Sequence, residues 1–213
     1  MQLYIVRHGQ TEFNVGEPRF RGQLDIPLSE IGIQQAEAIA LALKTIPFNT
    51  IYYSRLQRAK ITAEMIHHFH SSSRFIEEPL LITMNFGDWQ GQFHKEVFKT
   101  VEERKAWLTN PNTLVIPNGE TFYEVLNRVH RLLTRLRAQL EENIALITHR
   151  VVIIILLLYL FKLDPSHFWN FRVDTASITQ IQYNSNNTFR LIKLNETHHL
   201  TNLAHSNSRE TTF

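Results

Sequence analysis

Short apolar runs alternate along the chain with segments whose apolar positions repeat at helical spacing. Runs rich in β-branched and aromatic side chains predict strands at LYIV (3–6), TIYYS (50–54), Phe75-Ile76 and IALIT (144–148). Two further runs, SITQIQY (177–183) and FRLIKL (189–194), are separated by the turn-rich NSNN and predict a terminal hairpin.

Helical spacing predicts helices between these strands. Ser29 is a suitable N-cap for a helix whose apolar positions include Ala36, Ile39 and Leu43. Residues 56–69 and about 94–108 predict two more helices. The alternation of strands and helices indicates an α/β fold, a three-layer sandwich with a mostly parallel central sheet flanked by helices.

The clearest helix begins after Thr121. Thr121 and Glu124 form a capping-box pattern, and apolar residues from Val125 to Leu140 make a single stripe. Because they share the helix with this stripe, its arginines are expected on a solvated face. They are Arg128, Arg131, Arg135 and Arg137.

The run VVIIILLLYLF (151–161) predicts a buried helix. It has 11 residues and is bounded by His149, Arg150 and Lys162, whereas a membrane span needs about 20 apolar residues. No membrane partner is therefore expected.

Length and composition favour one domain over residues 1–203 of the 213. Residues 79–119 are irregular, with loop signals at NPN and IPNG, and are expected to form an inserted lid or specificity region. Residues 204–213 are expected to be a flexible tail.

A net charge of +2 is too small to indicate a nucleic-acid partner. The chain has no cysteine, which excludes disulfides and thiolate metal sites and is compatible with a cytoplasmic location. His67, His68, His70, His94 and His130 have no carboxylate at ligand spacing and are expected to be solvated rather than to bind metal.

Two predicted strands end in charged residues. Arg7 and His8 follow the first, and His149 and Arg150 follow the strand at 144–148. Ligands of parallel sheets bind beyond the carboxyl ends of the strands, so these residues are expected to share one site.

Several motifs occur in a characteristic order along the chain. They are RHGQTEFN (7–14), RGQLDIPLSEIGIQQAEAIA (21–40), YSRLQRAKITAEMI (53–66), NFGDWQG (85–91), PNGETF (117–122) and ITH (147–149). This set resembles the histidine phosphatase, or phosphoglycerate mutase-like, superfamily. Two segments, SHFWNFRVDTASI (166–178) and LNETHHL (194–200), are similar to the metal-independent phosphoserine phosphatases of this superfamily. The α-ribazole phosphatases are a neighbouring branch.

The resemblance implies a role for each matching residue. His8 is the expected nucleophile that forms a phosphohistidine, Arg7 and Arg58 the expected cationic clamps, and His149 a second histidine that donates to a phosphoryl oxygen. Asn14 and Gln23 are expected to add neutral hydrogen bonds. Gly9 is expected to allow close backbone approach, and Arg150 to offer its backbone N–H at a helix N-terminus.

One position departs from the family pattern. The family usually places a glutamate two residues before NFGDW as general acid and base, and this chain has Thr83 there, as a natural or an engineered substitution. Asp88 or Glu120 are the first candidates to replace it, with Glu77 and Glu78 behind them. Alternatively, the enzyme depends on good leaving groups, or the chain is a weakened relative.

The resemblance implies a metal-independent phosphatase without a cofactor, acting on a small phosphorylated metabolite such as phosphoserine and releasing inorganic phosphate. A catalytically impaired protein that binds phosphorylated ligands is the alternative that Thr83 motivates. Phosphoglycerate mutase action ranks lower, because the chain is short for the insertion that cofactor-dependent mutases carry. The branch it resembles includes homodimers, so a homodimer stays open.

Overall fold

A computed structural model describes residues 1–139, 142–184 and 188–203. Its centre is a six-stranded sheet with the order β3-β2-β4-β1-β5-β6. The strands are β1 (Gln2–Arg7), β2 (Thr50–Tyr53), β3 (Arg74–Glu77), β4 (Asn143–Thr148), β5 (Ile178–Tyr183) and β6 (Phe189–Glu196). β1 to β4 pair in parallel, and β5 and β6 form the antiparallel hairpin at one edge, so the predicted α/β class is correct.

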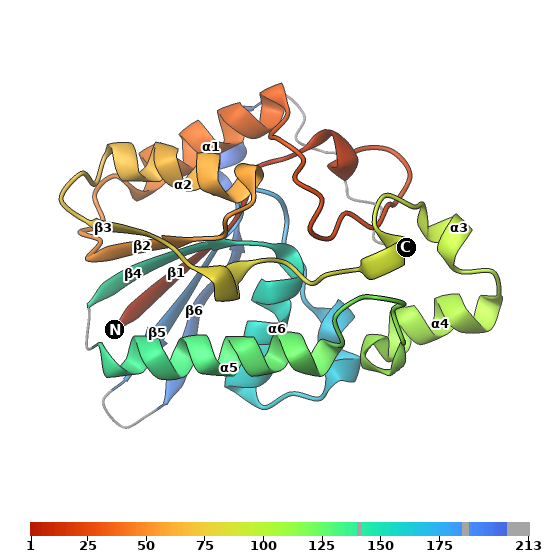
Figure 1. The fold of residues 1–213 in the computed structure, drawn as a ribbon. Coiled ribbons are helices and arrows are strands. Elements are labelled where there is room, and N and C mark those ends of the chain that lie inside the picture. The colour runs from red at the N-terminus through yellow and green to blue at the C-terminus, as the bar shows by residue number, and fades with distance from the viewer. Residues whose placement is uncertain (140–141, 185–187, 204–213) are drawn as a thin grey trace.

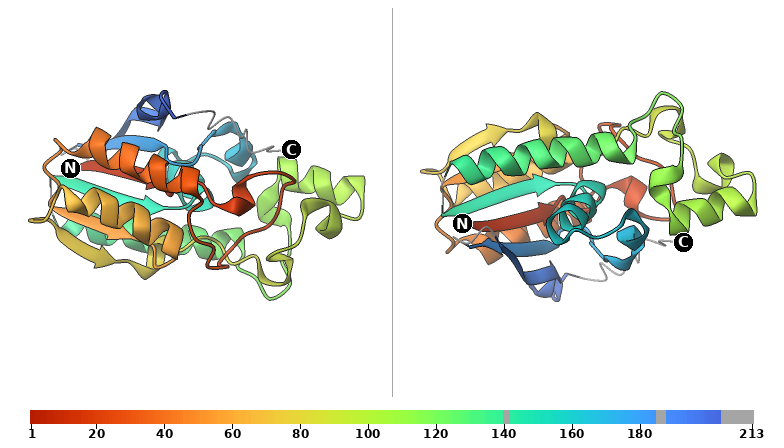
Figure 2. Two further views of the ribbon diagram at one scale, coloured as in Figure 1. Left: turned by 90° about the horizontal axis from the view of Figure 1, so that it is seen from above. Right: turned by 90° about the horizontal axis from the view of Figure 1, so that it is seen from below.

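Helices cover both faces of this sheet (Figure 1). α1 (Glu30–Leu43) and α2 (Gln57–His68) lie on one face, and α5 (Phe122–Ala138) and α6 (Arg150–Phe161) lie on the other. In Figure 2, α1 and α2 lie in front of the sheet when it is seen from above, and α5 and α6 lie in front of it when it is seen from below. This is the predicted three-layer sandwich.

The strands alternate their side chains between two cores. Ile144 and Leu146 of β4 pack with α5 and α6, whereas Ala145 and Ile147 pack with α1 and α2. α6 is buried from Val152 to Leu158, as its unbroken apolar sequence predicts. Within the described part of the chain, no helix is both long and apolar enough to span a bilayer.

Most of the region 79–119 lies beyond the carboxyl end of the sheet (Figure 1), whereas Pro79–Leu81 at its start packs against β4 and α5. The single helix expected at about 94–108 is wrong in detail, because the structure has α3 (His94–Val97) and α4 (Val101–Thr109). Thr100 caps α4, its Oγ1 accepting from the backbone N–H of Glu103 at 3.1 Å. Because Thr100 and Glu103 cap the start of α4, residues 94–109 form two helices instead of one. Short 3₁₀ turns fill the remainder.

The solvated arginine face expected on α5 is wrong for Arg128. Arg128 is buried and donates to the Leu80 carbonyl at 2.8 Å and to both carboxylate oxygens of Glu120 at 3.0 and 3.2 Å. Arg135 pairs with Glu78, and the guanidinium of Arg137 lies 4.5 Å from the Phe189 ring centroid. Leu140 of the predicted stripe, residues 185–187 of the turn and the tail at 204–213 lie outside the described residues.

Candidate active site

Three neighbouring strands deliver the central polar residues. His8 follows β1, His149 follows β4 and Ser54 follows β2. The backbone N–H of His8 donates to the Thr148 carbonyl at 3.1 Å, and that of Ser54 to the Ile147 carbonyl at 3.0 Å. Parallel pairing in the order β2-β4-β1 therefore places these residues together at the carboxyl ends of the strands. This is the location that the sequence predicted for His8 and His149.

His8 is held as a neutral imidazole with a defined tautomer. Its Nδ1 lies 2.6 Å from the Gly9 carbonyl oxygen, which only accepts, so Nδ1 carries the proton and Nε2 keeps its lone pair. Burial lowers the pKa of His8 well below its usual value, and the charges of Arg58 and Arg7 lower it further. An unprotonated Nε2 at neutral pH is the form that can attack phosphorus.

His149 lies beside His8, with 5.1 Å between the ring centroids. Its Nε2 is 2.8 Å from Ser54 Oγ, and its buried Nδ1 has no hydrogen-bond partner among the described residues. Burial, followed by the charges of Arg58 and His8, lowers the pKa of His149 well below its usual value. A neutral ring has one proton, and Nδ1 is the nitrogen available to a ligand.

Backbone carbonyls orient the two buried arginines. Arg7 donates from Nη1 to the Val173 carbonyl at 2.6 Å. Arg58 donates from Nη1 to the Leu24 carbonyl at 2.7 Å and from Nη2 to the Gly22 carbonyl at 2.9 Å. Burial, with the charge of Arg21 next, lowers the pKa of Arg58 to about 10, so its guanidinium stays charged at neutral pH.

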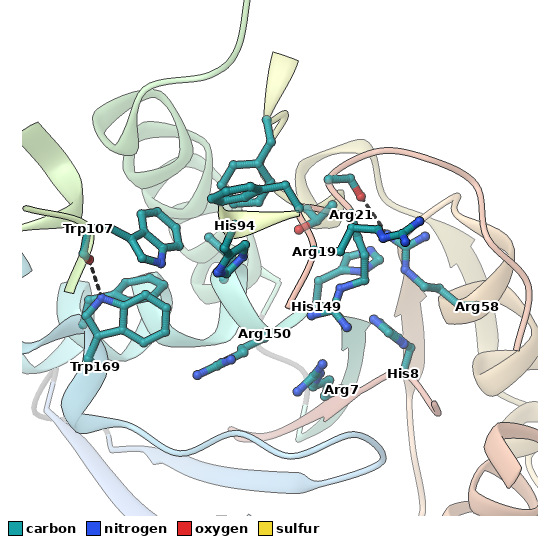
Figure 3. Close-up of a pocket in the computed structure, with 16 residues that line it drawn as sticks. Arg7, His8, Arg19, Arg21, Arg58, His94, Trp107, His149, Arg150 and Trp169 are labelled. Atoms are coloured by element: carbon teal, nitrogen blue, oxygen red, sulfur yellow. Dashed lines mark hydrogen bonds between the residues drawn. The ribbon is translucent and has the colours of Figure 1, made fainter. Parts of the chain in front are cut away.

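These residues line a cavity of about 90 Å³ (Figure 3). The arginines in its lining are Arg7, Arg19, Arg21, Arg58 and Arg150, and the aromatic residues are Phe20, Phe86, Trp107, Phe168 and Trp169. His8, His94, His149, Gly22, Thr83 and Val151 complete the described lining, which contains no aspartate or glutamate. Clustered guanidinium groups without a nearby carboxylate favour an anionic ligand.

Asn14 and Gln23 lie near this cavity but outside its lining. Asn14 Oδ1 accepts from the backbone N–H and the hydroxyl of Thr11, both at 2.8 Å, and Asn14 lines an adjoining cavity. Gln23 donates from Nε2 to the Thr83 carbonyl at 3.0 Å. In this structure both side chains hold loops around the site.

Gly9 permits a close approach to α1. A Cβ at Gly9 would lie 2.4 Å from the carbonyl oxygen of Gly32, so the small residue lets the loop after β1 pack against this helix. The close approach that Gly9 permits is therefore between its own backbone and the backbone of Gly32. Arg150, the first residue of α6, lines the cavity with its guanidinium 5.2 Å from the Trp169 ring centroid.

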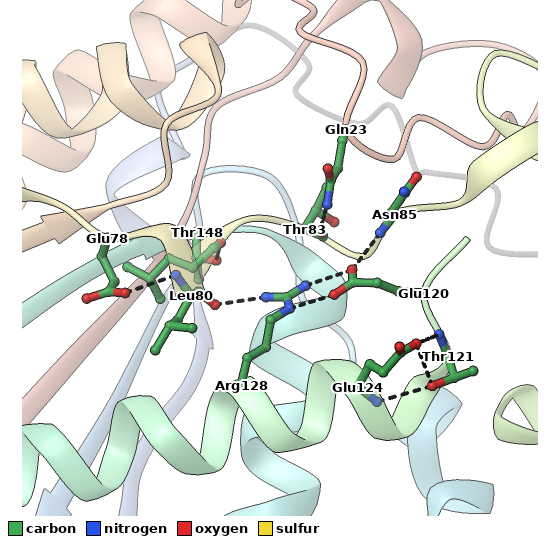
Figure 4. Close-up of polar contacts among 11 residues, drawn as sticks. Gln23, Glu78, Leu80, Thr83, Asn85, Glu120, Thr121, Glu124, Arg128 and Thr148 are labelled. Atoms are coloured by element: carbon green, nitrogen blue, oxygen red, sulfur yellow. Dashed lines mark hydrogen bonds and ion pairs between the residues drawn. The ribbon is translucent and has the colours of Figure 1, made fainter. Parts of the chain in front are cut away.

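Thr83 lies in the cavity lining, and the structure brings neither expected substitute carboxylate to it. Glu120 accepts from the Asn85 backbone N–H at 2.8 Å and pairs with Arg128 (Figure 4). Asp88 accepts from the side chain of Asn118 at 3.1 Å. Among the less favoured candidates, Glu78 accepts from Leu80 and pairs with Arg135, and Glu77 ends β3.

Several residues of the cavity lining were not predicted from the sequence. Arg19 and Arg21 come from the loop after RHGQTEFN, and Trp107 and Trp169 from segments distant in sequence. Arg19 and Arg21 stand just before Gly22 in the loop that follows the motif, and this pair of cationic residues was a signal available in the sequence. No comparable local signal marks the tryptophans, because only tertiary packing brings them together, with 5.2 Å between their ring centroids.

The expectation of solvated histidines is wrong for two members of that group. His70 is buried against Phe48, and His94 lies in the cavity wall with its ring centroid 4.2 Å from that of Phe20. Burial, followed by the charge of Arg21, lowers the pKa of His94 to about 4. Over the described ranges, no three His, Asp or Glu side chains gather as metal ligands.

A model described as the histidine phosphatase superfamily (branch 1) matches residues 3–197. The adenosylcobalamin/alpha-ribazole phosphatase of Salmonella typhimurium is 34% identical over 82% of this chain and 86% of its own length. Phosphoserine phosphatase 1 of Hydrogenobacter thermophilus is 32% identical over 94% of both chains. A mycobacterial glucosyl-3-phosphoglycerate phosphatase structure has a TM-score of 0.83 and 29% identity over 92% of this chain and 99% of its own.

Proposed function

We propose that this chain, which belongs to branch 1 of the histidine phosphatase superfamily, transfers the phosphoryl group of a small phosphomonoester to His8 and then to water. The two curated relatives described above are named phosphatases, and the chain is accordingly a phosphomonoester hydrolase. The single observation that carries the proposed mechanism is the contact of His8 Nδ1 with the Gly9 carbonyl at 2.6 Å, which in the neutral ring leaves Nε2 unprotonated.

In the first step, His8 Nε2 attacks phosphorus and the bond to the leaving oxygen breaks. The electron pair of that bond stays on the leaving oxygen, which takes a proton from solvent. Arg7 and Arg58 are fixed by backbone carbonyls, so their remaining N–H groups meet the phosphoryl oxygens without large reorganisation. His149 Nδ1 adds a neutral donor on the same side. These groups stabilise the charge spread over the phosphoryl oxygens in the transition state.

In the second step, water attacks the phosphohistidine and the P–N bond breaks. The electron pair returns to Nε2, so the departing imidazole needs no added proton. The contact between Nδ1 and Gly9 holds the ring in place through both steps. Inorganic phosphate is the product.

A small phosphorylated metabolite is the proposed substrate, with phosphoserine as one candidate because a similar protein carries that name. The aromatic wall around Trp107 and Trp169 is the region that meets the leaving group. Thr83 favours a second candidate function, a binding protein for phosphorylated ligands with weak turnover, because its hydroxyl cannot serve as an acid at neutral pH.

A hydrolysis assay separates these possibilities. The full-length protein is incubated with p-nitrophenyl phosphate and with phosphoserine in the presence of EDTA. The His8→Ala variant and a control variant at an exposed position, Arg131→Gln, are assayed in the same way. We expect turnover in EDTA and in the control, and a loss of about 10³-fold or more in His8→Ala. Unchanged turnover in His8→Ala would reject the mechanism. Phosphate binding without any turnover would favour the binding protein.

A further inference from the structure

The cavity provides positive charge for a leaving group but no proton. Its described lining contains no carboxylate, and apart from its three histidines Thr83 is the polar neutral side chain there. The acidic residue on the adjoining cavity, Glu17, is held by Lys95 at 2.6 Å. An alkoxide leaving group needs a proton as it departs, because alcohols, like water, are very weak acids.

The cavity contains more guanidinium groups than a single phosphoryl group requires. Arg7 and Arg58 are bound to carbonyls beside His8, while Arg19, Arg21 and Arg150 lie in the wall that the two cavities share. Figure 3 draws Arg150 between the His8 group and Trp169. Positive charge therefore continues from the nucleophile toward the aromatic wall.

Arg19, Arg21 and Arg150, here called the outer arginines, are each positioned by a defined contact. The guanidinium carbon of Arg19 lies 4.6 Å from the Phe13 ring centroid and 4.0 Å from that of Phe93. Arg21 donates from Nη1 to the Phe13 carbonyl at 3.3 Å, and Arg150 stacks on Trp169. A guanidinium group that stacks on an aromatic ring through its face can still bind phosphate oxygens through its N–H edge.

Arg21 links the two ends of the cavity. Its charge contributes to the lowered pKa of His8 at one end and of His94 at the other. Arg150 acts on His94 in the same direction. Because Arg21 and Arg150 line the same cavity as His8, an anion bound beside them would lie next to a phosphoryl group on His8.

We propose that Arg19, Arg21 and Arg150 bind a second phosphate group, so that the site takes the terminal phosphoryl group of a phosphoanhydride. The inference rests on the proposed function, because His8 must first act as the phosphoryl acceptor. A departing phosphate has a pKa near 6 and is stable as an anion at neutral pH, so it needs no acid. The outer arginines replace protonation by charge stabilisation.

The reaction balances without a further reactant. With a nucleoside diphosphate, His8 Nε2 forms a bond to the terminal phosphorus, and the bridging P–O bond breaks. Its electron pair stays on the bridging oxygen, so the nucleoside monophosphate leaves as an anion. Water then attacks the phosphohistidine, the P–N pair returns to Nε2, and dihydrogen phosphate keeps both water protons.

The test compares leaving groups in one assay. We expect kcat/KM of the full-length protein for ADP and inorganic pyrophosphate to exceed that for glycerol 2-phosphate by about 100-fold or more, since an acid contributes about 10² to 10⁴. Thr83→Glu is expected to raise kcat/KM for glycerol 2-phosphate by at least about tenfold, and that for ADP much less. Equal rates for ADP and glycerol 2-phosphate in the unmodified chain would overturn the inference.

A second comparison tests the outer arginines. Arg21→Gln is expected to lower kcat/KM for ADP by about tenfold more than it lowers kcat/KM for p-nitrophenyl phosphate, because only ADP has a second phosphate. Arg131→Gln, an exposed arginine on α5, is the charge-matched control and is expected to change neither. An equal loss on both substrates in Arg21→Gln would overturn the inference and leave the proposed function standing. No turnover of any substrate, p-nitrophenyl phosphate included, would reject both.

Discussion

Ser54 Oγ lies 2.8 Å from Nε2 of His149 and joins the ends of β2 and β4. Ser54 is fully buried, and His149 is 3% exposed. We expect the Ser54 hydroxyl to donate to Nε2, so that the neutral ring of His149 carries its proton on Nδ1. The pair thereby gives His149 the donor that a bound phosphoryl oxygen requires.

Ser54→Ala is expected to remove this control of the tautomer. We expect kcat to fall by about tenfold with a smaller change in KM, because the lost donor acts most strongly in the transition state. Nitrogen-15 NMR of His149 reports the tautomer directly, with Nδ1–H expected in the unmodified protein and a mixture in the variant. An unchanged His149 spectrum together with unchanged kcat would contradict this role.

The buried histidines make stability depend on pH. The folded pKa values of His8 and His149 lie below that of an unfolded histidine, so the unfolded state binds more protons below about pH 6.5. The free energy of unfolding should therefore fall as pH decreases from 7.5 toward 5. Urea titrations in phosphate-free buffer measure this, and His149→Gln should show a shallower decrease. Equal slopes in both proteins would argue against a neutral buried His149.

Gly32 on α1 faces the loop that carries His8. A Cβ at Gly32 would lie 2.0 Å from the Gln10 carbonyl oxygen. Glycine to alanine in a helix normally stabilises by about 1 kcal/mol, but this contact should make Gly32→Ala destabilising by about 1–3 kcal/mol. Its control is Ala42→Gly on the exposed face of α1, expected to cost about 0.5–1 kcal/mol without changing kcat. A stabilised Gly32→Ala would show that the loop is not packed as described.

Glu120 is expected to stabilise the fold and not to supply the acid. Glu120→Gln leaves the buried Arg128 without its carboxylate, which should lower the free energy of unfolding by about 1–3 kcal/mol. The kcat for glycerol 2-phosphate should change by less than about threefold. A loss of kcat by 100-fold with stability retained would instead make Glu120 the acid.

The fold was predictable because its signals are local. The capping box at Thr121, the apolar run after Arg150 and the strand endings at His8 and His149 each specify an element or its boundary. Motif order then indicated Arg58, which comes from α2 and lies in the same cavity.

What the sequence did not indicate depends on tertiary packing. Arg128 lies on a helix turn that appears solvent-facing in the charge pattern, yet Glu120 and the Leu80 carbonyl bury it. The loop arginines and Trp169 reach the cavity only through the arrangement of segments far apart in the chain. The absence of an acidic residue from the described lining likewise required the structure, since Asp88 and Glu120 were reasonable candidates on sequence distance alone.

Trapping the phosphorylated enzyme tests phosphoryl transfer through His8 most directly. The full-length protein is mixed with radiolabelled substrate in EDTA, quenched rapidly in alkali, which preserves a phosphohistidine, and mapped by mass spectrometry. We predict one phosphoryl group on His8 that forms and decays at rates able to account for turnover, and none in His8→Ala. Turnover without labelling of His8, or a label on another residue that turns over, would contradict the account.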